Sequence, residues 1–219
     1  MLILYRILTF IILVFTPLIL IYRLIIKKED FFRFKEKFCF STKNKKKGKI
    51  IWFHGASVGE LQSIVPLLEI YEKDKKIKQI LVTSNTLSSS KIVSNLRFKK
   101  VVHQFYPLDI NYFAKKFINY WKPSIVFFID SEIWPNMILG LKEKQIPTIL
   151  LNARITKKTF KKWIFLEKFA QKIFKNFDLC LASNNESKKY LKKLGVKNIK
   201  FLGNLKFSQL ENEKNEIDN

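Results

Sequence analysis

The stretch Ile50-Ile51-Trp52-Phe53-His54-Gly55-Ala56-Ser57-Val58-Gly59-Glu60 decides the fold of this chain. It begins as an apolar β-type run, turns between two glycines, and ends with a carboxylate at the start of the next helix. Strand–turn–helix junctions of this kind lie at the carboxyl edge of an open α/β sheet, where ligands bind. Backbone N–H groups at a helix start can hold an anion, and a carboxylate there can accept a proton. The stretch therefore predicts a site after the first strand, and it leaves the reaction open.

The chain after residue 49 alternates β-type apolar runs with helical patterns. Such alternation predicts a parallel, doubly wound sheet. Near-continuous apolar runs such as Ile125-Val126-Phe127-Phe128-Ile129 are typical of strands that are covered on both faces. The predicted strands are 50–54, 79–83, 101–105, 125–130, 148–152, 179–182 and 199–202. The predicted helices are about 60–72, 88–97, 110–120, 133–144, 159–176 and 184–194.

The first 26 residues predict a membrane anchor. No charge interrupts the sequence from Ile7 to Tyr22, and Arg6 and Arg23 stand near the ends, where their side chains can reach the head groups. A spanning helix needs about 20 apolar residues, which this segment supplies. We expect a spanning helix rather than a cleaved signal peptide, because no small-residue cleavage site follows. An interfacial helix lying among the head groups is the alternative.

A basic segment follows the anchor directly. Residues 27–49 carry ten Lys and Arg against three acidic residues, which predicts that this flank and the domain after it lie on the cytoplasmic side. The same cations would hold the domain against the anionic lipid of the membrane. Residues 31–38 within the segment have the pattern of an amphipathic surface helix.

The net charge of the whole chain limits which classes of partner are expected. A formal net charge of +23 predicts an anionic partner: nucleic acid, phospholipid head groups or a phosphorylated substrate. Part of the excess is the solvated lysine of an ordinary surface. The sequence has neither an aromatic–basic RNA-binding pattern nor a helix-turn-helix pattern, so no nucleic acid is expected. Two cysteines and two histidines are too few for a disulfide framework or a histidine-rich metal centre.

Glu60 has two interpretations. It follows Ser57 at the spacing of a capping box, in which the glutamate only bonds back to the first N–H groups of its helix. The other interpretation is a functional carboxylate. Gly55 and Gly59 favour a site, because they strip side chains from a turn where a ligand could approach the backbone.

A second acidic cluster, Asp130 and Glu132, follows the most hydrophobic predicted strand. It therefore belongs at the same carboxyl edge as Glu60. Two carboxylates at the end of a buried strand are costly unless they are bonded or functional. The alternatives are an N-terminal capping arrangement of the next helix and a catalytic site.

Polar residues also follow the other strands. Hydroxyl-rich loops can bind sugar hydroxyls or phosphate, and they are often plain turns. Arg154 could clamp an anion, or pair with a carboxylate of the Asp130 and Glu132 cluster. No Gly-rich dinucleotide loop, Walker A loop or nucleophile elbow is present, so cofactor binding is not expected. The polar residues at these strand ends are Thr83, Thr86, Asn152, Arg154, Asn204 and Lys206.

Together these motifs resemble one family, the 3-deoxy-D-manno-octulosonic acid (Kdo) transferases of lipopolysaccharide assembly. Their order and spacing follow the family pattern over nearly the whole chain. Two positions depart from it: Asp130 stands where the family more often has Glu, and Ser208 stands where Asp often follows. The matching stretches are Trp52-Phe53-His54, Ser57-Val58-Gly59-Glu60, Thr83 with Thr86, Pro107-Leu108-Asp109, Glu132-Ile133-Trp134-Pro135-Asn136, Asn152-Ala153-Arg154 and Gly203-Asn204-Leu205-Lys206-Phe207.

The resemblance implies a Rossmann-like, N-terminal domain of a two-domain (GT-B type) inverting glycosyltransferase that needs no metal. It implies transfer of Kdo from CMP-Kdo to a hydroxyl of the lipid A precursor at the bacterial inner membrane. In that family the glutamate matching Glu60 is the general base, and the glutamate matching Glu132 belongs to the active centre. The residues expected to bind substrate are Ser57, Gly59, Thr83, Thr86, Asn152, Arg154, Asn204 and Lys206.

We expect four parts along the chain: an anchor helix over 1–26, a basic juxtamembrane segment over 27–49, an acceptor-side domain over 50–208, and a disordered tail or start of a linker over 209–219. The family has a second α/β domain that binds most of the CMP part of the donor, and this chain is expected to end where the connecting segment begins. The alternative function is a non-catalytic, membrane-tethered module that binds lipid A phosphates or other polyanions.

Overall fold

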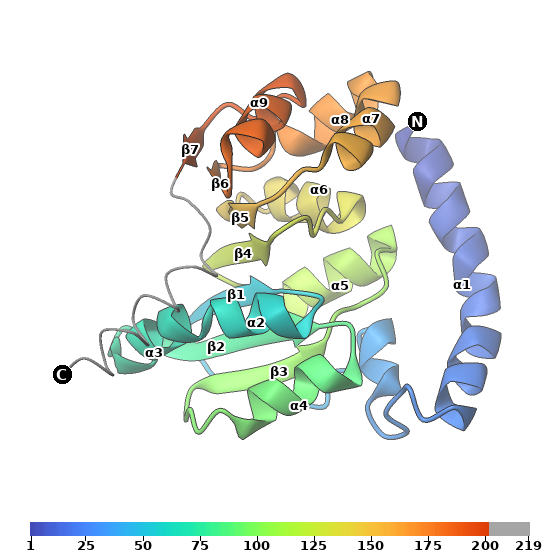
Figure 1. The fold of residues 1–219 in the computed structure, drawn as a ribbon. Coiled ribbons are helices and arrows are strands. Elements are labelled where there is room, and N and C mark those ends of the chain that lie inside the picture. Colours follow the sequence, from blue (N-terminus) through green and yellow to red (C-terminus); the bar gives the residue numbers. More distant parts are fainter. Residues whose placement is uncertain (202–219) are drawn as a thin grey trace.

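The computed structural model of the protein describes residues 1–201. They form a seven-stranded sheet in the order β3-β2-β1-β4-β5-β6-β7, in which every neighbouring pair is parallel (Figure 1). The predicted Rossmann-like, doubly wound fold is confirmed. The strands are β1 (Lys49–His54), β2 (Ile77–Ser84), β3 (Val101–Phe105), β4 (Ile125–Ile129), β5 (Thr148–Ala153), β6 (Leu179–Ala182) and β7 (Ile199–Phe201).

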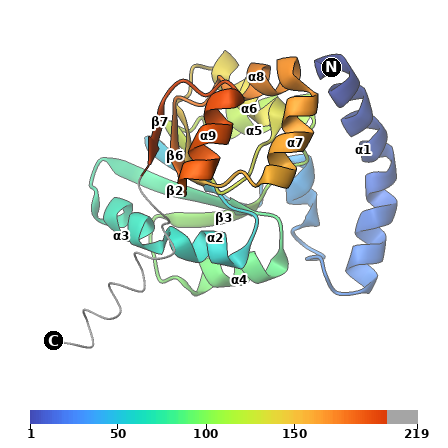
Figure 2. The same ribbon diagram turned by 45° about the horizontal axis from the view of Figure 1, so that its top comes forward.

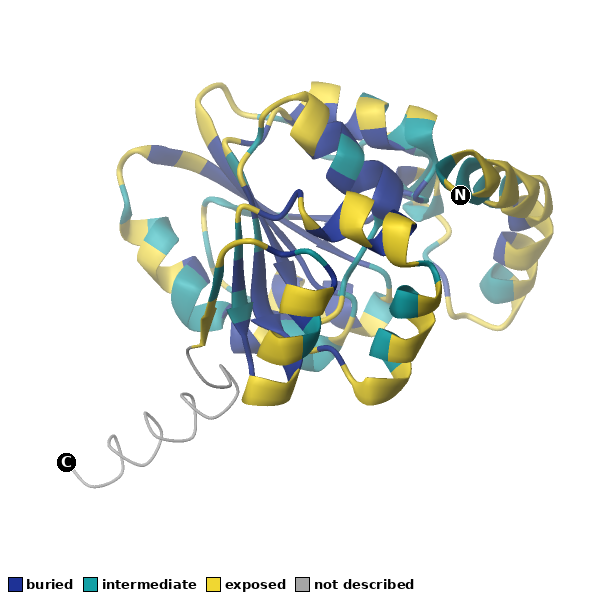
Figure 3. Cartoon of the chain, turned by 90° about the horizontal axis from the view of Figure 1, so that it is seen from above, coloured by how far each residue is buried: buried dark blue, intermediate teal, exposed yellow. Residues whose placement is uncertain are grey.

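Helices cover both faces of this sheet, because each parallel pair needs a crossover connection. One group of helices packs on one face beside Ile51 and Phe53 of β1, and the other group packs on the opposite face beside Ile50 and Trp52. The core is therefore buried on both sides of the strands (Figure 3). The first group is α2 (Val58–Ser63), α3 (Val65–Lys73) and α4 (Leu87–Asn95); the second is α5 (Asn111–Trp121), α6 (Pro135–Glu143), α7 (Lys157–Phe165), α8 (Glu167–Phe174) and α9 (Asn185–Lys193).

Two of the predicted helices are each divided in two. The helix predicted over 60–72 breaks at Ile64, because Pro66 in the first turn of α3 has no N–H to donate and cannot continue the preceding helix. The helix predicted over 159–176 breaks at Leu166, where the backbone leaves the helical region. The motif at 203–207, its residues Asn204 and Lys206, and the tail at 209–219 lie outside the described residues.

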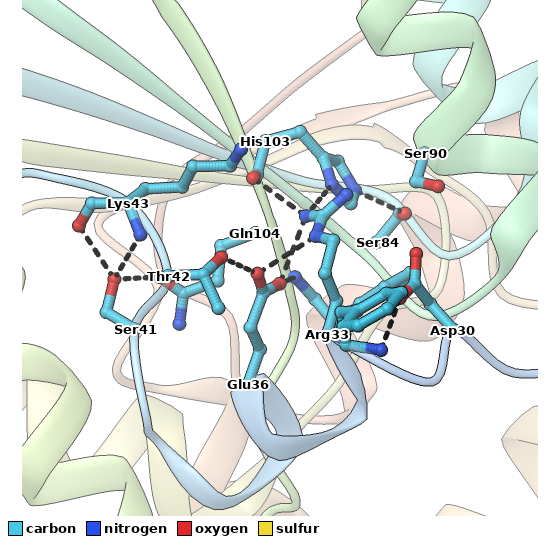
Figure 4. A network of polar contacts seen from close by, with 12 residues as sticks. Asp30, Arg33, Glu36, Ser41, Thr42, Lys43, Ser84, Ser90, His103 and Gln104 are labelled. Atoms are coloured by element: carbon cyan, nitrogen blue, oxygen red, sulfur yellow. Dashed lines mark hydrogen bonds and ion pairs between the residues drawn. The ribbon is translucent and has the colours of Figure 1, made fainter.

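The predicted surface helix over 31–38 is wrong. A single 3-10 turn, η1 (Phe34–Phe38), forms there, and its Glu36 is fully buried against the edge strand β3 (Figure 4). Glu36 accepts two hydrogen bonds from the Arg33 guanidinium (2.9 and 3.0 Å), one from the Phe105 N–H (2.7 Å) and one from the Thr42 hydroxyl. The juxtamembrane segment is thus bonded to β3 through Glu36 and Arg33, which accept from the Phe105 N–H and donate to the His103 carbonyl (3.0 Å), respectively.

His103 on β3 completes this network. The Arg33 guanidinium lies 2.9 Å from its Nδ1, and Ser84 lies 2.8 Å from its Nε2. Burial, together with the positive charges of Arg33 and Lys43, lowers the pKa of His103 to about 3. The imidazole is therefore neutral at physiological pH, which suits a ring packed beside a cation.

Glu36→Gln tests whether the buried Glu36 carboxylate, paired with Arg33, holds the juxtamembrane segment against β3. Removing one partner of a buried ion pair leaves the other uncompensated, so we expect the free energy of unfolding to fall by about 3 kcal/mol. Glu143→Gln is the matched control, because Glu143 forms an exposed pair with Lys115 (3.0 Å) and its loss is expected to change nothing measurable. Equal stability of the two variants in denaturant unfolding would contradict the expectation.

Candidate active site

The strand order reverses between β1 and β4, so the loops that follow these two strands leave the same edge side by side. The register places His54, the last residue of β1, opposite Phe128 of β4. Ligands of open α/β sheets bind in the crevice at this switch point. The loop after β1 leads to Glu60, and the loop after β4 carries Asp130 and Glu132.

Glu60 is half-buried in the first turn of α2, and both of its oxygens are bonded. Oε2 accepts from the Ala56 N–H (2.8 Å) and Oε1 from the Ser57 hydroxyl (2.8 Å), while Ser57 Oγ accepts from the Glu60 N–H (3.3 Å). This is the predicted capping arrangement, with the glutamate bonding one residue further back than in a standard capping box. The cap does not exclude a chemical role, since it fixes the carboxylate at the edge.

The electrostatic setting of Glu60 favours proton uptake. Burial raises the pKa of this carboxyl, and the negative charges of Glu132 and Asp130 raise it further. The hydrogen bonds from Ser57 and Ala56 act in the opposite direction and lower the pKa. The net direction is upward, which brings a carboxylate closer to the pKa that suits a base working near neutral pH.

Glu132 is bonded to a histidine and a tryptophan. Its Oε2 accepts from Trp134 Nε1 (2.9 Å) and lies 3.2 Å from Nε2 of the fully buried His54. Trp134 Nε1 also lies 3.1 Å from His54 Nε2. Because an indole nitrogen only donates, Glu132 is the acceptor of this group, and its carboxylate is held in one orientation.

Polar contacts at the other ring nitrogen, together with a stacked ring, hold His54 in place. Its Nδ1 lies 3.0 Å from Thr83 Oγ1, and Trp52 Nε1 donates to the same hydroxyl (2.8 Å). The Tyr106 ring stacks on the imidazole with centroids 3.8 Å apart. Thr83, which was predicted to bind substrate, is fully buried. It therefore contributes to the site by holding His54 in place and presents no surface to a substrate.

Asp130 and Asn152 join the ends of β4 and β5. Their side chains are hydrogen-bonded through Asn152 Nδ2 and Asp130 Oδ1, and both residues have a positive φ, of 50° for Asn152 and 58° for Asp130. Asn and Asp tolerate this left-handed backbone better than most residues. The pair therefore shapes the loop on which Glu132 stands, and the backbone N–H of Arg154 adds a bond to the Asp130 carbonyl (3.2 Å).

The remaining residues that were predicted to bind substrate differ in how exposed they are. Ser57, Thr86 and Arg154 are exposed, and Gly59 is half-buried in the first turn of α2. Thr86 caps α4 by accepting from the Ser89 N–H (3.2 Å), as a plain turn residue would. Its neighbour Ser89 donates to the Ala56 carbonyl (3.2 Å), which joins the loops after β1 and β2. The structure thus brings the loops of all four central strands to one edge.

Two buried polar atoms at this edge have no hydrogen-bond partner among the described residues. They are the Tyr106 hydroxyl and Asn152 Oδ1. An orphaned buried polar atom costs about 1–3 kcal/mol. The residues that the structure describes include no group of three His, Cys, Asp or Glu side chains placed to hold a metal.

His54, Tyr106 and Asp109 contribute to this site and were not predicted to do so. Asp109 is buried and accepts from the N–H groups of Asn136 (3.0 Å) and Met137 (2.9 Å), so a side chain from another loop caps α6. Burial raises the pKa of Asp109 above its usual value, although hydrogen bonds from Tyr5, Asn136 and Met137 act in the opposite direction. Their position in the sequence could have predicted this, because all three residues lie at or just after the end of a strand.

The fold defines the class of the domain, which is Rossmann-like and of the GT-B type. Two solved UDP-N-acetylglucosamine 2-epimerases share it. One has a TM-score of 0.52 at 18% identity, covering 72% of this chain and 49% of the other. The epimerase of Neisseria meningitidis, solved with UDP-GlcNAc, has a TM-score of 0.53 at 15% identity, covering 76% and 50%. At such identities the likeness establishes the fold alone.

The family follows from the sequence. The family model for 3-deoxy-D-manno-octulosonic-acid transferase (kdotransferase) matches residues 32–209, and the chain belongs to this family. The 3-deoxy-D-manno-octulosonic acid transferase of Rickettsia bellii is 38% identical over 96% of this chain and 50% of its own length. The transferase of Haemophilus influenzae is 28% identical over 75% and 39%. The chain spans about half the length of the curated relatives it matches, or less.

Gly55→Ala tests how tightly the turn before Glu60 is packed. A Cβ at this position would lie 3.1 Å from Glu60 Cβ, 3.1 Å from Ile129 Cδ1 and 3.2 Å from Leu61 Cδ2. We expect a destabilisation of about 1–3 kcal/mol in denaturant unfolding. Ser88→Ala is the control, because Ser88 is exposed on α4 and its truncation adds no atom to the core. A Gly55 variant as stable as the Ser88 variant would contradict the close packing.

Proposed function

We propose that this chain is the acceptor-side half of a Kdo transferase, which transfers Kdo from CMP-Kdo to a hydroxyl of the lipid A precursor, lipid IVA. One observation carries the proposal. At the switch point of a GT-B-type domain in this family, Glu60 presents a half-buried carboxylate with a raised pKa, next to Glu132 and Asp130. Such a group can take the proton that an attacking hydroxyl must lose.

The proposed reaction is a single displacement with inversion that needs no metal. The acceptor oxygen forms the new glycosidic bond to the anomeric carbon of Kdo, the bond from that carbon to the CMP phosphate breaks, and CMP leaves with the electron pair. The hydroxyl proton passes to Glu60. Ser57 and the Ala56 N–H hold the Glu60 carboxylate in place for this step (both 2.8 Å).

Glu132 is proposed to belong to the same active centre. Trp134 and His54 fix one of its oxygens, and Thr83 and Trp52 fix His54. Its negative charge keeps the pKa of Glu60 raised. We propose that the exposed residues of the edge contact the substrates. They are Ser57, Thr86 and Arg154, with the half-buried Gly59 and the buried Asn152 beside them and with Asn204 and Lys206 from beyond the described residues.

The donor and the membrane are the other proposed partners of this chain. We infer that most of CMP-Kdo is held by a second domain, corresponding to the half of the relatives that this chain does not match. The apolar helix α1 (Leu2–Ile25) could anchor to a membrane by its length and composition. Together with the net charge of +23, it supports a site on the cytoplasmic face of the inner membrane, where anionic lipid and a phosphorylated acceptor would both be attracted.

Glu60→Gln tests the base, assayed in a chain that carries a donor-binding domain. Glutamine keeps the size and one cap acceptor, so the fold and acceptor binding should persist. Loss of the base should lower kcat by about 10²–10⁴-fold. The control is Glu186→Gln, which changes an exposed first-turn glutamate of α9 bonded to Tyr190 (2.7 Å) and should leave kcat unchanged. Full turnover in Glu60→Gln would rule out the base.

Asp130→Asn, measured in the same assay, tests whether neighbouring negative charge raises the pKa of Glu60. Glu60 must be unprotonated to act, so the acid limb of kcat/KM should follow its raised pKa and lie above that of an ordinary glutamate. Removing the charge of Asp130 lowers the pKa of Glu60, so this limb should move to lower pH. Asparagine suits the positive φ at this position and can still accept from Asn152. A limb that stays in place or moves to higher pH would contradict the proposal.

A further inference from the structure

The N-terminal end of α1 is bonded to the domain. The Tyr5 hydroxyl donates to the buried carboxylate of Asp109 (2.7 Å). Arg6 donates through Nη2 to Asn111 Oδ1 (2.9 Å) and through Nε to Asn136 Oδ1 (3.2 Å). The first turns of the helix therefore lie at the start of α5 and α6, on the same body as the candidate active site.

The C-terminal end of α1 is bonded to the same domain through a buried carboxylate. Arg23 Nε lies 3.0 Å from Glu29 Oε2, and Lys37 Nζ lies 2.6 Å from the same oxygen. Lys37 belongs to η1, whose Glu36 accepts from the Phe105 N–H of β3 (2.7 Å). Glu29 is almost fully buried, so this is a built contact rather than a chance surface pair.

Between these two ends α1 runs alongside the domain (Figures 1 and 2). Its inner stripe is buried or half-buried at helical spacing, at Thr9, Leu13, Thr16 and Leu20, and the outer surface is exposed and apolar. A cavity of about 250 Å³ lies between the inner stripe and the body, lined by Ile12, Leu13, Leu108, Ile110 and Trp134 among others. The helix thus faces the domain along its length rather than projecting from it.

This arrangement conflicts with a helix that crosses a bilayer. A 24-residue helix is about 36 Å long, and the hydrocarbon core is about 30 Å thick, so a spanning helix separates its ends onto opposite sides. Tyr5 and Arg23 lie near opposite ends, yet both ends are bonded to one domain. We propose that α1 lies in the plane of the membrane surface, with both ends on the side of the domain and its outer face in one leaflet of an anionic bilayer.

The surface around α1 suits this partner. Phe31 and Phe32 are 70% and 79% exposed and continue the apolar surface past the end of the helix. Lys27 and Lys28 follow the helix directly and are exposed, where they would meet anionic head groups. An interfacial anchor buries one apolar face in the lipid and keeps its other face out of it, and here the domain covers the inner stripe of α1. The inference rests on the membrane association proposed above and not on the transfer reaction.

In-plane seating would also place the active site beside the lipid. The Asp109 and Asn136 side chains that bind α1 also fix the start of α6, directly after Trp134. Trp134 lines the cavity beneath α1 and donates to Glu132. A helix in the surface plane would therefore bring the head-group layer to the edge where Glu132 and Glu60 stand.

The first experiment locates the two ends of the chain in membranes from expressing cells. One protease site is placed before Met1 and another after Asn219, and right-side-out and inverted vesicles are treated separately. In-plane seating predicts that both sites are cleaved from the same vesicle face. Cleavage from opposite faces would overturn the inference. If the protein does not sediment with membranes at all, the membrane association under the proposed function fails with it.

A depth measurement keeps the test independent of the added sites. Nitroxides are attached to one introduced cysteine per variant, at Ile7, Val14 or Ile21, with the native Cys39 and Cys180 replaced by alanine. The three positions share the exposed face at seven-residue spacing, and relaxation by oxygen against a nickel complex reports depth. In-plane seating in vesicles containing phosphatidylglycerol predicts one common depth, with Thr16→Cys on the inner stripe shallower. A maximum depth at Val14, with Ile7 and Ile21 near the two surfaces, would overturn the inference.

Discussion

The reversal of strand order between β1 and β4 is the constraint on which the candidate site depends. Neighbouring strands of a parallel sheet end at one edge, but only at the reversal do the following helices leave toward opposite faces and open a crevice. Glu60 belongs to the loop and helix on one side of that crevice, and Glu132 to the loop on the other. Their interaction is therefore a product of topology as much as of sequence spacing.

The contacts of Glu60 show that a helix cap and a base are compatible interpretations of one carboxylate. Its hydrogen bonds to Ser57 and Ala56 favour the charged form, whereas burial and the carboxylates of Glu132 and Asp130 favour the protonated form. The balance gives a positioned carboxylate with a raised pKa. A carboxylate of this kind suits the proposed deprotonation of a hydroxyl.

The sequence was sufficient where a local pattern determines the structure. Short apolar runs alternating with helical patterns predicted all seven strands, and with them the edge that holds Glu60, Asp130 and Glu132. The sequence was insufficient where a residue far away in the chain determines a contact. Nothing local shows that Glu36 becomes buried against Phe105, that Thr83 bonds inward to His54, or that both ends of α1 return to the domain. These outcomes depend on contacts between residues far apart in the chain.

The most direct measurement is the pKa of Glu60 itself, obtained by NMR titration of a side-chain ¹³C label in this chain, bound to lipid nanodiscs. A carboxyl that is half-buried beside two other carboxylates at the switch point should titrate above the 4.5 of an ordinary glutamate. A pKa at or below that value would mean that the cap dominates. Glu60 would then be a structural residue, and the assignment of a base at this edge would be wrong.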